Sequence, residues 1–251
     1  VLVEDDRAVG VRLEDGGEHK ADVVVSAADG RTTIFDMLDG IYVNKKVNGY
    51  YKDLKLFPPL IYVGLGIART FDDVPTTITG INFPFEEPVR IGDVERDHMS
   101  VQFYSYDPTL APEGRTFARV HYPTDYDFWD RLSRDREAYR AEKERVADAV
   151  VAQLDRRFPG VGAKVEMRDV ATPMTWVRYT GNWRGSFEGW IETTDTLTMR
   201  MSQSLPGLRD FYMAGQWVQP GGSVPAVAMS GRNAVQIICA RDKRPFGTST
   251  P

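Results

Sequence analysis

Residues 211–239, FYMAGQWVQPGGSVPAVAMSGRNAVQIIC, constrain the fold more than any other part of the chain. Phe211–Ala214 is a short apolar run that predicts a buried strand, and Gly215 ends it. A loop containing Pro220–Gly222 then leads to Val224-Pro225. Proline is common in the first turn of a helix, because the backbone N–H that it lacks has no hydrogen-bond partner within the helix there. Small and apolar residues follow at helical spacing, which predicts a buried helix.

This order of strand, glycine loop and helix N-terminus is suited to holding a ligand. Glycines let the backbone approach a bound molecule closely. The start of a helix offers free N–H groups and a partial positive charge. A buried helix after a glycine turn, with no ligand, is the alternative interpretation.

The same stretch resembles the C-terminal flavin-binding signature of the carotenoid desaturase and isomerase family, which includes phytoene desaturase, carotenoid isomerase and retinol saturase. The resemblance is carried by Ala214-Gly215, Pro220-Gly221-Gly222, Val224-Pro225-Ala226 and Ser230-Gly231. An acidic residue commonly follows the first glycine in that family, and Gln216 stands there in this chain. The resemblance implies FAD as cofactor, with contacts from Ala27, Ala28, Gly215, Gln216, Gly222, Ser223, Val224, Pro225 and Ala226.

The N-terminal segment Val1–Ser26 predicts three strands, with Glu14–Gly17 as a hairpin turn. The β-branched run that ends at Ser26 is typical of a strand buried on both faces. Ala27 and Ala28 follow it and leave room for a ligand. In the resembling family a β-meander leads back to the nucleotide-binding sheet here, although a plain hairpin and core strand would explain the pattern equally well.

No G-x-G-x-x-G fingerprint for the FAD diphosphate occurs in the sequence. Gly64–Arg69 has an arginine in place of the third glycine, and the surrounding residues predict a strand that runs through both glycines. Val1–Val3 has the pattern of the middle of a strand. We therefore expect this chain to be the C-terminal portion of an FAD-dependent oxidoreductase.

Between the two ends the sequence predicts a mostly antiparallel sheet with one long helix. The expected strands are Leu60–Phe71, Thr76–Phe83, Met99–Tyr106, Arg115–Tyr122 and Lys164–Ala171, and the expected helix is Arg136–Phe158. The predicted fold class is α/β plus α+β. Residues 1–29 and 209–243 would form parts of a Rossmann-type FAD-binding domain, and residues 30–208 an inserted substrate-binding domain.

Thr172–Trp190 concentrates aromatic residues and glycines, and it also resembles the carotenoid isomerase and retinol saturase branch. A large apolar substrate needs aromatic walls with few charges. The candidate substrate-binding residues are Trp176, Tyr179, Trp183 and Trp190. Ordinary core packing explains them equally well. Arg178, Tyr179 and Glu188 are candidates for moving a proton, and no catalytic residue is assigned.

Composition excludes several other functions. A net charge of -5 over 251 residues argues against nucleic-acid binding. His19, His98 and His121 are scattered and predict no metal site.

The resemblance implies desaturation, saturation or isomerisation of a lipophilic, carotenoid-like polyene. An amine-oxidase-like flavoprotein and a non-catalytic binding module of the same fold are the alternatives. We expect a lipophilic small molecule as substrate and a homo-oligomer formed through an exposed sheet edge. The expected location is cytoplasmic, and peripheral contact with a membrane is an open alternative.

Overall fold

The computed structural model describes residues 1–75 and 77–248. In it, two short strands from opposite ends of the chain pair in parallel. The chain divides into two compact units, residues 1–57 with 180–248 and residues 58–179. We expected boundaries near residues 29 and 209. The structure instead groups residues 30–57 and 180–208 with the chain ends.

In the first unit the N-terminal segment forms four strands rather than the expected three. Strands β1 (Leu2–Glu4), β2 (Arg7–Arg12) and β3 (Glu18–Lys20) make an antiparallel sheet in that order. Strand β4 (Val24–Ser26) leaves this sheet and pairs with β10 (Phe211–Met213). The last backbone hydrogen bond to the antiparallel sheet is donated by Ala21 N–H to Val9 O. Three residues later, Val24 N–H donates to Asp210 O, next to β10.

Helix α5 (Val224–Arg241) follows β10 through the glycine loop and begins at the predicted residue. Its predicted burial is wrong for most of its length, because only Ser230 and Ala234 are buried. Four large apolar residues keep 41–79% of their surface exposed: Val224, Met229, Val235 and Ile237. Apolar spacing predicts a helix, whereas burial depends on what packs against it, and the described residues leave much of the surface of α5 uncovered.

The rest of the first unit is built from short elements: a π-helical turn η1 (Thr32–Asp36), helix α1 (Lys45–Asp53) and a 3₁₀ turn η3 (Trp183–Gly185). The sequence analysis did not predict α1. Its N-cap is Asn44, whose Oδ1 accepts from Val47 N–H at 2.9 Å. Apolar residues of these elements form one core with the strands, among them Val24, Ile34, Val47, Leu205, Phe211 and Met213.

The second unit contains the predicted antiparallel sheet, in the order β6-β7-β8-β5-β9. Its strands are β5 (Leu60–Ile67), β6 (Gly80–Ile91), β7 (Val94–Phe103), β8 (Thr116–Pro123) and β9 (Val165–Ala171). Strand β5 runs through Gly64 and Gly66, as predicted. Thr76, the first residue of one expected strand, lies outside the described residues.

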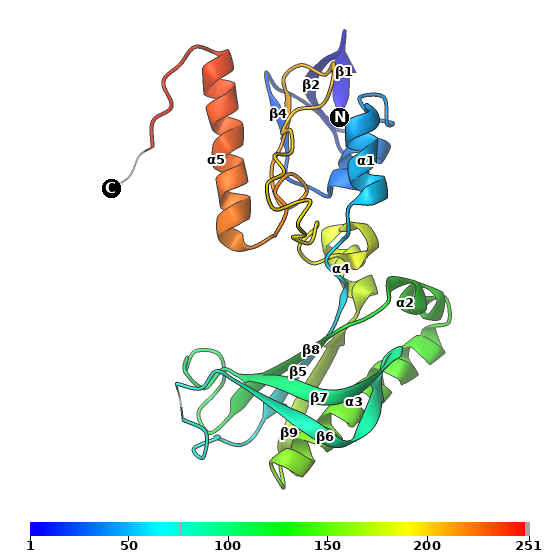
Figure 1. Cartoon of the computed structure of the whole chain (residues 1–251), viewed down its shortest axis with the longest axis vertical. Helices are drawn as coiled ribbons and strands as arrows, with labels where there is room; N and C mark the ends of the chain where they lie inside the picture. Colours follow the sequence, from blue (N-terminus) through cyan, green and yellow to red (C-terminus); the bar gives the residue numbers. More distant parts are fainter. Residues whose placement is uncertain (76, 249–251) are drawn as a thin grey trace. The chain divides into compact units, whose positions relative to one another are not determined.

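Four helical segments accompany this sheet: α2 (Tyr126–Ser133), α3 (Arg136–Arg157), η2 (Gly162–Lys164) and α4 (Pro173–Thr180). Alternate residues of β5 point into the core, so Ile61 and Leu65 are fully buried. They share this core with Val146, Val150 and Leu154 of α3, which runs along the sheet (Figure 1). Within the described ranges, none of the helices is long and apolar enough to cross a membrane.

Candidate functional site

A cavity of about 520 Å³ lies in the first unit, where β4 and β10 end and α5 begins. Three segments supply most of its lining: Ala27–Asp29, Ala214–Trp217, and one face of α5 with Val224, Val227, Ala228 and Gly231. The helical residues are three or four positions apart, which places them on one side of α5. Among the described residues, Asp29 is the only charged one that lines the cavity.

The side of the cavity along α5 contains unfilled space. A Cβ atom built on Gly231 would meet no atom within 4 Å, and Val224 is 79% exposed. A Cβ on Gly215 would meet only the carbonyl oxygen of Ala27, at 3.7 Å. Small residues therefore leave space that larger side chains would fill.

Hydrogen bonds fix the Gly215 turn to α5. Gly215 has a φ of +96°, a conformation that favours glycine, and its N–H donates to Ser230 Oγ at 2.7 Å. The buried Gln203 amide donates to the carbonyl oxygens of Met213 and Ser230, at 2.9 and 2.7 Å. Strand, turn and helix are thus joined by buried polar groups, and these hold the cavity's edge in place.

The N-terminus of α5 has no side-chain cap. Ser223 occupies the N-cap position with a φ of +73° and makes no capping hydrogen bond. Pro225 has no N–H to satisfy. The first turn of α5 therefore offers N–H groups and a partial positive charge beside Val224, which lines the cavity.

Five of the nine residues predicted to contact the cofactor line this cavity: Ala27, Ala28, Gly215, Gln216 and Val224. Gly222, Ser223, Pro225 and Ala226 are not among the lining residues. Gly222 has a φ of +61°, and a Cβ there would lie 2.6 Å from the Cβ of Glu188. In this structure Gly222 thus gives room to Glu188, which was a candidate for moving a proton.

Asp29, which the sequence analysis did not select, is a buried carboxylate that joins two distant segments. It is 4% exposed, and its Oδ1 accepts from Thr32 N–H at the start of η1 at 2.8 Å. Its Oδ2 accepts from Trp183 N–H, also at 2.8 Å. Asp29 therefore fixes the turn at Trp183 next to Asn182, a cavity-lining residue.

Replacing Asp29 by asparagine is expected to destabilise the first unit. One carboxylate oxygen becomes an NH₂ group that faces an N–H donor, and a hydrogen bond to a charged group contributes about 1.5–3 kcal/mol. Urea unfolding followed by tryptophan fluorescence measures this loss. Asp36→Asn is the matched control, since Asp36 is exposed and lies 3.7 Å from Arg31. Equal stability of the two variants would contradict the role given to Asp29.

The four aromatic residues predicted to bind substrate fall into different units. Trp183 and Trp190 lie in one cluster of the first unit, with ring centroids 6.3 Å apart, together with Tyr51 and Trp217. Trp190 is fully buried, and its Nε1 donates to Trp217 O at 3.2 Å. Burial, and then the charge of Asp29, raises the pKa of Tyr51, so its phenol stays neutral.

Trp176 and Tyr179 lie on α4 in the second unit. Trp176 Nε1 donates to Leu60 O at 3.4 Å, and Tyr179 is 75% exposed beneath the guanidinium of Arg178. The sequence analysis missed a further aromatic surface in this unit. Half-buried Tyr62, Tyr104 and Phe117 lie on or beside the sheet, and Arg119 stacks on the two tyrosines. In the structure, buried and half-buried residues alternate along β8, which puts Phe117 and Arg119 on its less buried face.

Across residues 1–75 and 77–248, no group of three or more His, Cys, Asp or Glu side chains could hold a metal ion.

The fold, with mixed helices and antiparallel sheets, is that of a flavin-containing oxidoreductase. The chain belongs to the flavin containing amine oxidoreductase family, whose model matches residues 1–239. The predicted membership in an FAD-dependent oxidoreductase family is thereby confirmed.

Several curated proteins are similar to the chain over nearly all of its length. Prolycopene isomerase from Arabidopsis thaliana is 26% identical over 96% of this chain and 39% of its own length. Phytoene desaturase (neurosporene-forming) from Rhodobacter capsulatus is 28% identical over 93% of this chain and 46% of its own length. The chain thus spans about two fifths to one half of these relatives.

An oxidoreductase from Methanosarcina mazei of known crystal structure has a similar fold, with a TM-score of 0.54 at 16% identity. The match covers 94% of this chain and 47% of that one.

Proposed function

We propose that this chain forms the flavin-contacting and substrate-contacting part of an FAD-dependent oxidoreductase that desaturates, saturates or isomerises a lipophilic polyene. The observation that carries the proposal is the nearly neutral cavity between the ends of β4 and β10 and the uncapped start of α5. The names of the similar proteins, prolycopene isomerase and phytoene desaturase, support the polyene class.

The residues around the cavity fit a flavin. Ala27 and Ala28 are small, the Gly215 turn leaves open space, and Gln216 offers a polar amide. The first-turn N–H groups of α5 suit the oxygens of a flavin pyrimidine edge, since the helix dipole favours negative charge there. Bound FAD supplies the hydride-accepting and hydride-donating chemistry, so the protein's own task is to bind, orient and tune it.

Each unit offers its own candidate aromatic contacts for the substrate. In the second unit, Tyr62, Tyr104 and Phe117 offer half-buried rings, and Trp176 and Tyr179 lie on α4. Burial, and then the charge of Arg119, lowers the pKa of His121 on the same strand as Phe117, so that this imidazole is neutral at pH 7. In the first unit, Trp183 would contact the substrate and fully buried Trp190 would support it.

The test is turnover by the protein expressed from its full gene and loaded with FAD. We expect it to convert phytoene or prolycopene supplied in lipid vesicles, because a polyene reaches the protein from a membrane surface. Absorption spectra of the extracted polyenes measure the reaction. Trp183→Ala should lower kcat/KM by about tenfold or more, equivalent to about 1.4 kcal/mol of transition-state stabilisation.

Two results would replace this proposal by one of the alternatives. Oxidation of benzylamine with no change in either polyene would assign an amine-oxidase-like function. A colourless protein that cannot be loaded with FAD would assign a non-catalytic binding module.

A further inference from the structure

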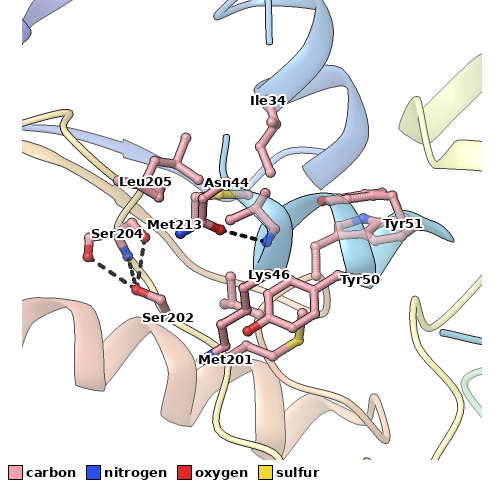
Figure 2. Close-up of a pocket in the computed structure, with 14 residues that line it drawn as sticks. Ile34, Asn44, Lys46, Tyr50, Tyr51, Met201, Ser202, Ser204, Leu205 and Met213 are labelled. Carbon is pink, nitrogen blue, oxygen red and sulfur yellow. Dashed lines mark hydrogen bonds between the residues drawn. The ribbon is translucent and has the colours of Figure 1, made fainter. Parts of the chain in front are cut away.

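A second cavity, of about 180 Å³, lies in the first unit between α1, the loop at residues 201–206, and the residues around β10 (Figure 2). It is separate from the cavity at α5, and of the residues that the structure describes only Trp217 lines both. The proposed flavin chemistry gives this second cavity no role.

A buried phenol without a partner marks the cavity as a binding site. Tyr50 is 8% exposed and lines the cavity. Its hydroxyl is buried and forms no hydrogen bond with any residue that the structure describes. Buried polar groups in native proteins are nearly always paired, so this hydroxyl needs a partner from outside these residues.

The charges around the cavity indicate what that partner is. In the described part of the chain, Lys46 is the only charged residue that lines the cavity, and no carboxylate there pairs with it. Lys46 and Tyr50 are four residues apart on α1 and therefore share one face. Asn44 also lines the cavity, and its Oδ1 already caps α1, which leaves its NH₂ group to donate. Lys46, Asn44 and the Tyr50 hydroxyl can thus all donate to a ligand, and they carry one positive charge, which suits an anionic acceptor.

Most of the remaining lining residues are apolar, and the two serines, Ser202 and Ser204, hydrogen bond to each other. Buried Ile34, Val47, Leu205, Met213 and Val218 line the cavity together with the rings of Tyr51 and Trp217. Figure 2 shows Lys46, Tyr50 and Tyr51 on α1, with Lys46 and Tyr50 extending toward Met201. An apolar cavity of about 150 Å³ is known to hold one benzene ring, so the volume here is enough for one ring or a short chain.

We propose that this cavity binds a small monocarboxylic acid whose apolar body has about six to eight carbons, with its carboxylate held by Lys46 and Tyr50. The body lies among the buried aliphatic residues. Because Trp217 lines both cavities, occupancy changes the surroundings of a residue at the proposed flavin site.

Isothermal titration of benzoate into the protein expressed from its full gene tests this proposal. We expect one saturable site with a dissociation constant on the order of 1 mM or tighter, within the ligand-efficiency bound for about nine heavy atoms. Tryptophan fluorescence should change along the same binding curve. Lys46→Met should weaken binding by about tenfold or more, and Tyr50→Phe by about threefold or more, since each removes a group that pairs with the carboxylate.

The matched control is Lys45→Met, which removes the same charge from the neighbouring residue of α1 that does not line the cavity. Its affinity should stay within about twofold of the original, because an exposed charge farther from the ligand is screened. The proposal is overturned if benzoate does not saturate, if neutral benzamide binds equally tightly, or if Lys45→Met and Lys46→Met weaken binding to the same extent.

Discussion

The 251-residue chain, expressed and purified by itself, is expected to contain no stoichiometric FAD. In dinucleotide-binding folds the diphosphate rests on a G-x-G-x-x-G turn at a helix N-terminus, and this sequence contains no such motif. Each charge-assisted hydrogen bond to the diphosphate contributes about 1.5–3 kcal/mol. The loss of two would weaken binding by about a hundredfold to more than ten-thousandfold.

A flavin absorption spectrum of the isolated chain measures this directly, and light scattering adds its oligomeric state. In the described part of the chain β4 pairs only with β10, and Val25 on β4 is 48% exposed. We therefore propose that the isolated chain associates through this edge. A stable monomer that carries one tightly bound FAD would show that the nucleotide site is placed wrongly.

The second large effect is expected from Gly231→Leu, tested in the protein expressed from its full gene. A side chain at this position would project into the open space of the α5 cavity, where nothing lies within 4 Å. We expect the ratio of FAD to protein after purification to fall by about tenfold or more, equivalent to about 1.4 kcal/mol of lost binding. The fold should persist, because glycine inside a helix costs about 0.8–1 kcal/mol relative to alanine.

Gly247→Leu is the matched control for that substitution. Gly247 also has nothing within 4 Å, lies beyond the end of α5, and does not line the cavity. Its FAD content should equal that of the unmodified protein. Full FAD content in Gly231→Leu would contradict the role given to the cavity.

Elements governed by local backbone chemistry could be predicted from the sequence. Strand β10 ends just before Gly215, whose positive φ favours glycine. Pro225 lies in the first turn of α5, where a residue without an N–H is tolerated. The strand through Gly64 and Gly66 was also predicted from local sequence. The residues around both glycines favour a strand, and Arg69 replaces the third glycine that a dinucleotide-binding turn would need.

Features that depend on distant contacts could not be predicted. Asp29 and Trp183 are 154 residues apart, and no local pattern indicates that they form a hydrogen bond. Helix α1 has few apolar residues, and its packing against the loop at residues 201–206 defines the second cavity. Trp176 and Trp183 are close in sequence, yet they belong to different compact units, so spacing alone could not group the aromatic residues.

The most direct test of the central claim is a crystal structure of the protein expressed from its full gene with FAD bound. The account predicts isoalloxazine density in the cavity of the first unit, against Ala27 and Ala28 on one side and Val224, Ala228 and Gly231 on the other. The first-turn N–H groups of α5 should face the pyrimidine edge of the ring. Ring density outside this cavity, or α5 directed away from the ring, would contradict the account.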